Sequence, residues 1–142
     1  MARGGGRTKT WCDATEAKQR LEIAREFLEV ADLVDEERGK DASLVYPSAA
    51  ASLAVLAGIA AADAASCAAL QERSRSQNHH DAEELLEQIE PDGKRAARAL
   101  RDLLNLKDKA QYGVLPVSRR ELTVVMRKAK QLLEFAEIVV RR

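Results

Sequence analysis

Apolar residues recur along this chain at steps of three and four, the spacing that places them on one side of an α-helix. The spacing predicts helices over about 13–37, 78–89, 91–113 and 118–140. The stripe of the first helix consists of Ala17, Leu21, Ala24, Leu28 and Ala31. No stretch shows the two-residue alternation of a half-buried strand, so the pattern predicts an all-α fold with short connections.

The segment 43–70 predicts a further helix of a different kind. Its first twenty residues, SLVYPSAAASLAVLAGIAAA, carry no charge, which is enough length to cross a bilayer. Alanine is only marginally apolar, and Pro47 and Asp63 interrupt or bound the run. We therefore expect a central buried helix and no membrane span. Small residues at four-residue steps, at Ala54, Gly58 and Ala62, allow another backbone to approach closely.

Capping signals mark where three of the helices begin. Asn78 is a candidate N-cap, and the carboxylate of Asp81 three residues later favours a helix N-terminus. Pro91 is typical of a first helical turn. Ser118 and Glu121 match the S-x-x-E capping box. Together with the periodicity, these signals predict an up-and-down bundle of about five helices.

Length and charge indicate less about the fold and function of this chain than the pattern of apolar residues does. A chain of 142 residues forms one domain, which we place at 13–142, after a flexible basic tail over 1–12 that begins MARGGGRTKT. Lys and Arg together number 23, as do Asp and Glu, so the net charge indicates neither nucleic acid nor a membrane as partner. The polar start contains no signal peptide, which predicts a cytoplasmic protein.

The two cysteines are too few and too far apart in sequence to indicate a zinc cluster or a disulfide framework. Cys67 lies in the alanine-rich helix and is expected to be a small core residue. The chain contains no P-loop, no dinucleotide-binding glycine pattern and no metal-ligand spacing. These observations predict no cofactor and no metal.

Two stretches, LAVLAGIAAADAASCAAL and LLNLKDKAQYG, resemble segments of the HEPN superfamily, and NHHDAEELL between them resembles an actinobacterial branch of it. The resemblance covers about 17–140. It implies a compact helical bundle that forms a homodimer. It also implies an RNA-associated or interaction module of a toxin–antitoxin or phage-defence pair. Members are often encoded beside a minimal nucleotidyltransferase, which in some systems attaches AMP to a tyrosine that Tyr112 matches.

Many HEPN proteins are metal-independent ribonucleases with an R-x4–6-H motif. At the matching position this chain has Lys107 and Gln111, so no imidazole is available there and the motif is degenerate. Arg75 and His80 have the right spacing, as do Arg73 and His79, but they lie upstream, between the second and third helices. An active ribonuclease that uses Arg75 and His80 is one alternative. A non-enzymatic helical scaffold is the other.

Asp63 is a carboxylate inside an alanine-rich helix, where a charge needs a hydrogen bond or a cation. HEPN-like packing would bring the second and fourth helices together, which makes Lys107 or Arg101 its expected partner. A polar pocket of Asp63, Lys107, Tyr112 and His80 that binds a phosphate or nucleotide is an alternative. In a third interpretation, Asp63 reaches solvent at the edge of its helix.

Overall fold

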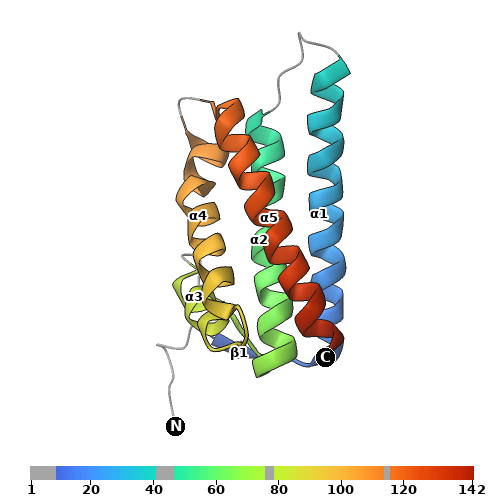
Figure 1. Cartoon of the computed structure of the whole chain (residues 1–142), viewed down its shortest axis with the longest axis vertical. Helices are drawn as coiled ribbons and strands as arrows, with labels where there is room; N and C mark the ends of the chain where they lie inside the picture. The colour runs from blue at the N-terminus through green and yellow to red at the C-terminus, as the bar shows by residue number, and fades with distance from the viewer. Residues whose placement is uncertain (1–8, 41–46, 76–78, 114–115) are drawn as a thin grey trace.

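The computed structural model describes residues 9–40, 47–75, 79–113 and 116–142. In this part of the chain it contains five helices and a two-stranded sheet, which confirms the predicted all-α bundle. The helices are α1 (Ala14–Lys40), α2 (Pro47–Leu70), α3 (His80–Glu87), α4 (Gly93–Tyr112) and α5 (Arg119–Arg141). The four long helices run along the long axis of the molecule, with α5 crossing in front of α2, and the short α3 lies beside one end of α4 (Figure 1).

Of the three predicted capping signals, the one at Ser118 is confirmed, and α1 has a cap that the sequence analysis did not predict. Ser118 and Glu121 form both hydrogen bonds of the capping box, and Asp13 caps α1 by accepting from the backbone N–H of Glu16 at 2.8 Å. The N-cap of α3 is His79, whereas the expected cap, Asn78, lies outside the described residues.

The start of α4 lies two residues later than predicted. The helix begins at Gly93, not at Pro91, because Asp92 between them has a left-handed backbone conformation, with φ at 73°. A Cβ atom at Gly93 would lie 2.2 Å from the carbonyl oxygen of Leu86. Only glycine permits this close approach of the start of α4 to the end of α3.

The alanine-rich α2 is the central helix and packs against α1, α4 and α5. It is long and apolar enough to cross a membrane, and 67% of its most apolar window is buried inside the bundle, as expected for a core helix. Gly58 lies against side chains of two neighbouring helices. A Cβ atom there would lie 2.2 Å from Cδ1 of Leu103 and 3.3 Å from Cδ1 of Leu132. Side chains of α4 and α5, not a backbone, fill the space that the small residue leaves.

Two features of the first twelve residues differ from the prediction. Lys9–Trp11 form strand β1, which pairs antiparallel with β2 (Glu72–Ser74), so Lys9 lies opposite Ser74. The expectation of no strand, and of a flexible tail that reaches residue 12, was therefore wrong for residues 9–12. Strands of three residues are too short to show an alternating pattern, which is why they could not be predicted from the sequence.

Candidate functional site

Cys12 and Cys67 form a disulfide, contrary to the expectation from the sequence. Their Cα atoms lie 5.5 Å apart across a sequence separation of 55, and both side chains are fully buried. The pairing of β1 with β2 explains the contact, because β2 directly follows α2 and so carries Cys12 back to the end of that helix. The backbone N–H of Cys12 donates to the carbonyl oxygen of Gln71 at 3.0 Å, which fixes this approach.

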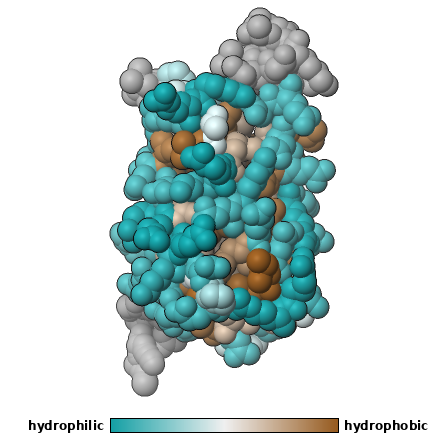
Figure 2. All heavy atoms as spheres, in the orientation of Figure 1, coloured by the Kyte–Doolittle hydropathy of each residue, from teal (hydrophilic) through white to brown (hydrophobic). Residues whose placement is uncertain are grey.

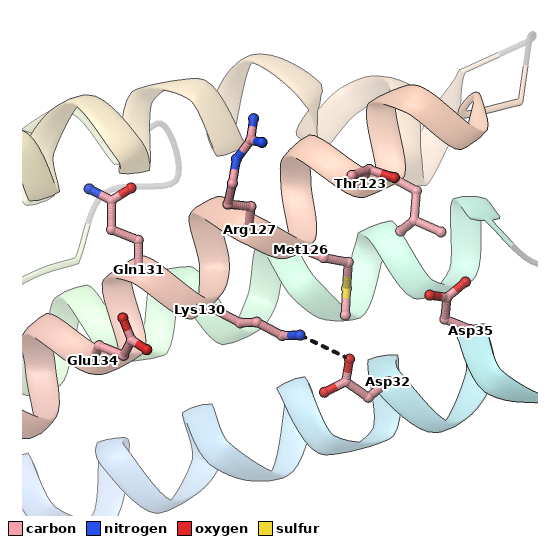
Figure 3. A pocket seen from close by; sticks show the side chains of 9 residues that line it. Asp32, Asp35, Thr123, Met126, Arg127, Lys130, Gln131 and Glu134 are labelled. Atoms are coloured by element: carbon pink, nitrogen blue, oxygen red, sulfur yellow. Dashed lines mark ion pairs between the residues drawn. The ribbon is translucent and has the colours of Figure 1, made fainter.

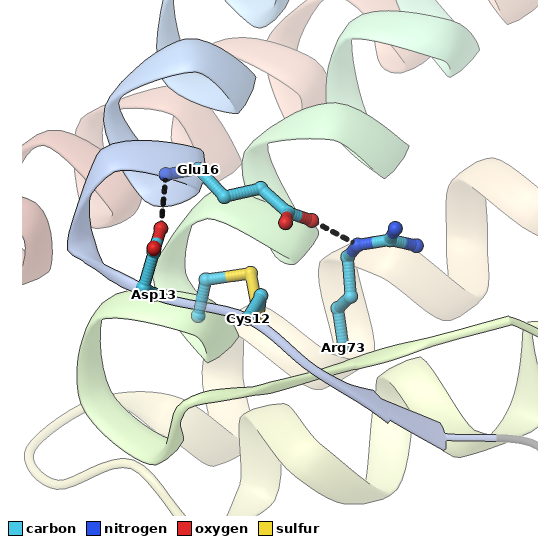
Figure 4. Close-up of a disulfide and its surroundings, with 5 residues drawn as sticks. Cys12, Asp13, Glu16 and Arg73 are labelled. Atoms are coloured by element: carbon cyan, nitrogen blue, oxygen red, sulfur yellow. Dashed lines mark hydrogen bonds and ion pairs between the residues drawn. A yellow bond between two sulfur atoms is a disulfide. The ribbon is translucent and has the colours of Figure 1, made fainter.

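Charged side chains surround the disulfide. Glu16, in the first turn of α1, forms an ion pair with Arg73 of β2 directly beside the two sulfur atoms (Figure 4). Both side chains are partly buried, with 31% and 24% of their surface exposed. The strand pairing therefore brings a carboxylate, a guanidinium and two sulfur atoms together at one end of the bundle.

Asp63 belongs to the same polar cluster. It is buried, with 8% of its surface exposed, and lies one helical turn before Cys67 on the same side of α2. Burial raises the pKa of its carboxyl to about 6, and Glu16 acts in the same direction, whereas the positive charges of Arg20 and Arg73 lower it. Desolvation is the largest of these influences, so the two arginines offset only part of the cost of burying the charge.

The prediction that Lys107 or Arg101 pairs with Asp63 was wrong. Arg101 instead donates to Glu83 of α3 at 3.0 Å. The register of α2 against α4 explains why Lys107 is distant from Asp63. The two helices are antiparallel, since the hydroxyl of Ser52 donates to the carbonyl oxygen of Ala110 while Gly58 faces Leu103. At 1.5 Å per residue this places Asp63 and Lys107 about 13 Å apart along the helix axes.

The predicted pocket of Asp63, Lys107, Tyr112 and His80 is therefore not assembled around Asp63. Lys107 lies near His79 at the start of α3, and the side chain of His80 is exposed. The side chain of Tyr112 lies outside the described residues. The four positions do not share one site that includes the buried carboxylate.

Of the two histidines, His79 has the more unusual surroundings. Arg75 and His80, the expected catalytic candidates, are both exposed, whereas His79 is half-buried and has a left-handed backbone conformation. Burial lowers the pKa of its imidazole, and the positive charge of Lys107 lowers it further. The sequence did not indicate this pair, because the two residues come together only through the packing of α3 against α4.

An open groove of about 460 Å³ lies between α1 and α5 (Figure 3). The ammonium group of Lys130 spans it to Asp32 at 3.6 Å. Its lining mixes Asp32, Asp35 and Glu134 with Arg127 and Lys130. None of the residues predicted from the sequence to form a site lines this groove, and its charges are of both signs.

α1 also carries partly exposed apolar side chains, of which Phe27 and Val34 pack in part against the core. Ile23, Phe27, Val30 and Val34 follow one another at three- and four-residue steps, and Ile23 and Val30 are 38% and 44% exposed. The residues of α1 that pair with α5, Arg25 and Asp32, lie on the opposite side of the helix. This apolar stripe therefore faces away from α5.

α2 continues this surface with Leu53, Leu56 and Ile59, which are half-buried. Gly58 faces α4 and α5, and Leu56, two positions earlier, projects from nearly the opposite side of the helix. We call these residues, together with the stripe of α1, the α1–α2 face. By contrast, the face that carries α5 is mostly hydrophilic, with separate apolar patches (Figure 2).

A comparison of the chain with models of known families, with curated proteins and with solved structures finds no match.

Proposed function

We propose that this chain is a HEPN-like interaction module that works as a homodimer, and that its α1–α2 face is the dimer interface. The observation that carries the proposal is the apolar stripe on the outer side of α1, which continues onto α2. Adjoining apolar surface of this kind is typical of a protein–protein contact. The balanced charge, 23 basic against 23 acidic residues, means that two copies do not repel each other at long range.

The wider role rests on the resemblance to HEPN proteins. We propose a module of a toxin–antitoxin or phage-defence pair that associates with RNA or with a minimal nucleotidyltransferase, with Tyr112 as the residue that would receive AMP. Arg75 and His80 are exposed and a glutamine stands where the family has its histidine, so we do not assign catalysis to Arg75 and His80 or to the position that matches the family motif. The module would act by binding.

Light scattering at tens of micromolar tests the dimer. We expect a mass of twice the 15.6 kDa of the chain. Glutamate at Ile23 or Val30 should give a monomer with unchanged helical circular dichroism, because it would place a charge in an apolar contact. Ile138→Glu is the matched control, since Ile138 is an exposed apolar residue of α5 and should leave the dimer intact. A monomeric wild type, or dissociation by Ile138→Glu alone, would contradict the proposal.

A second candidate, metal-independent ribonuclease activity, is favoured by His79 and Lys107. A half-buried histidine with a lowered pKa is neutral at pH 7 and can accept a proton, while the nearby ammonium group can hold a phosphate. The test is cleavage of a fluorogenic RNA by the wild type in the presence of EDTA. His79→Ala should reduce cleavage about 100- to 10,000-fold, and His80→Ala should not. A wild type that cleaves no RNA eliminates this candidate.

A further inference from the structure

The sulfur atoms of the disulfide share their surroundings with a carboxylate. The Sγ atoms of Cys12 and Cys67 and a carboxylate oxygen of Glu16 all lie within 4.8 Å of one another. The two cysteines are fully buried and Glu16 is partly exposed. Cys12 directly follows β1, Glu16 lies in the first turn of α1 and Cys67 lies in α2, so three backbone segments fix the arrangement.

We propose that, in the reduced protein, Cys12, Cys67 and Glu16 form a binding site for Zn²⁺ or a similar thiophilic divalent cation. Thiolates and carboxylates are both zinc ligands, and three protein ligands leave one position for water. Two sulfur atoms bound at about 2.3 Å to one tetrahedral zinc ion lie about 3.8 Å apart. Side-chain rotation can open the disulfide to this separation, because the Cα atoms are only 5.5 Å apart.

The ion pair between Glu16 and Arg73 is compatible with this site. The guanidinium contacts Oε2 of Glu16, so the second carboxylate oxygen can bind a cation while the ion pair persists. Because 31% of the Glu16 side chain is exposed, we expect water to reach the fourth position from that side.

The charge of the cluster also permits a divalent cation. Binding displaces the two thiol protons, so two thiolates and one dication together carry the same charge as two neutral thiols. The charges of Glu16 and Asp63 remain opposite those of Arg20 and Arg73. The bound ion therefore adds no net charge to a partly buried region, where an uncompensated charge would be costly.

Metal binding and the disulfide are then alternative states of one site. With hydrogen peroxide as the oxidant, the two thiolates lose two electrons and form the sulfur–sulfur bond. The peroxide takes up these electrons and two protons to give two molecules of water, and the cation is released. This inference does not depend on the proposed dimer, because no residue of the α1–α2 face contributes to the site.

Cobalt(II) provides a direct probe, because thiolate ligands give it a charge-transfer band. The full chain is reduced, freed of reductant without oxygen, and titrated with Co²⁺. We expect the band to saturate at one equivalent, to disappear on addition of Zn²⁺ or peroxide, and to be absent from the oxidised protein. Cys67→Ser should abolish the band, and Glu16→Gln should weaken binding at least about tenfold. Glu22→Gln, at an exposed position of α1, is the control that should leave the titration unchanged.

Circular dichroism of the reduced protein keeps the test decisive. If the reduced chain is folded and gives no thiolate–cobalt band, the proposal is wrong. If it is unfolded, Zn²⁺ should restore the helical signal at one equivalent in the wild type and not in Cys67→Ser. Failure to restore it would equally overturn the proposal.

Discussion

Asp63 is the single residue whose charge is least compatible with its surroundings. Its pKa rises from an ordinary value of 3.8 to about 6 on folding, so between these pH values the folded state binds more protons than the unfolded state. Stability from this residue is therefore present at low pH and is lost as the pH rises from about 4 to 6. The loss amounts to about 3 kcal/mol, at 1.36 kcal/mol for each pH unit.

Asp63→Asn should remove this pH dependence, because the amide resembles the protonated carboxyl. At pH 7 we expect the oxidised variant to be more stable than the wild type by up to about 3 kcal/mol, with the difference vanishing below pH 4. Urea unfolding at several pH values measures it. Asp108→Asn, at an exposed position, serves as the control and should follow the wild type. A constant difference between wild type and Asp63→Asn across this range would refute the assignment.

Gly58 is a second residue at which a small change should affect the stability, because an added Cβ atom has no space. Alanine would favour the helix by about 1 kcal/mol, but its Cβ atom would lie 2.2 Å from a methyl group of Leu103, which is fully buried and has little room to move. Overpacking of this kind costs about 1–3 kcal/mol, so Gly58→Ala should lower the stability.

The prediction for Gly58 can be checked by a double-mutant cycle. In a Leu103→Val background the offending methyl is absent, and Gly58→Ala should then be neutral or stabilising. Thermal unfolding of the four proteins gives the coupling between the two sites, expected at about 0.5–3 kcal/mol. Equal effects of Gly58→Ala in both backgrounds would show that Leu103 is not the obstacle.

At the scale of elements, the features that could be predicted from the sequence are those that depend on residues close together in the chain. The helices followed from their periodicity, and the capping box at Ser118 from four consecutive positions. The sheet could not be predicted, because each strand has three residues and their pairing joins segments more than sixty residues apart in the chain. The partners of Asp63 were missed for a related reason, since they depend on the register of α2 against α1 and α4.

The capping box of α5 makes a testable contribution. Ser118→Ala removes the acceptor for the backbone N–H of Glu121 and should cost about 1 kcal/mol. Ser118→Asp can accept the same hydrogen bond and should restore most of the loss. Urea unfolding of the three proteins measures the effect. An alanine variant as stable as the wild type would mean that the first turn of α5 can fray without loss of stability.

At the scale of the molecule, the disulfide joins the start of the chain to the central helix. Closure of a loop of 55 residues restricts the unfolded chain and contributes about 4 kcal/mol in the chain-entropy model. With EDTA present to exclude metals, reduction should lower the stability by this order, and Cys12→Ser/Cys67→Ser should match the reduced wild type. If reduction leaves the urea midpoint unchanged, the bond does not contribute to stability.

The disulfide also bears on the compartment predicted from the sequence. Disulfides persist in oxidising compartments and are rare in the cytosol, where thiols are kept reduced. A cytoplasmic location would therefore favour the dithiol form of Cys12 and Cys67. Trapping the thiols in intact cells with a maleimide of known mass would show which form is present.

The composition of α2 has a consequence for how uniquely the chain folds. Alanine methyl groups cover much of α2, so the helix presents nearly the same surface after it is rotated by one residue. Its many alanine contacts therefore distinguish poorly between the native packing and packings in which the helix is rotated. The distinction falls to the positions that interrupt the alanines. Besides the larger apolar residues, these are the missing side chain at Gly58, the charge at Asp63 and the bond at Cys67. Energy and uniqueness thus come from different residues of one helix, and a sequence that kept every alanine but lost these three would have a collapsed core with several nearly equivalent arrangements.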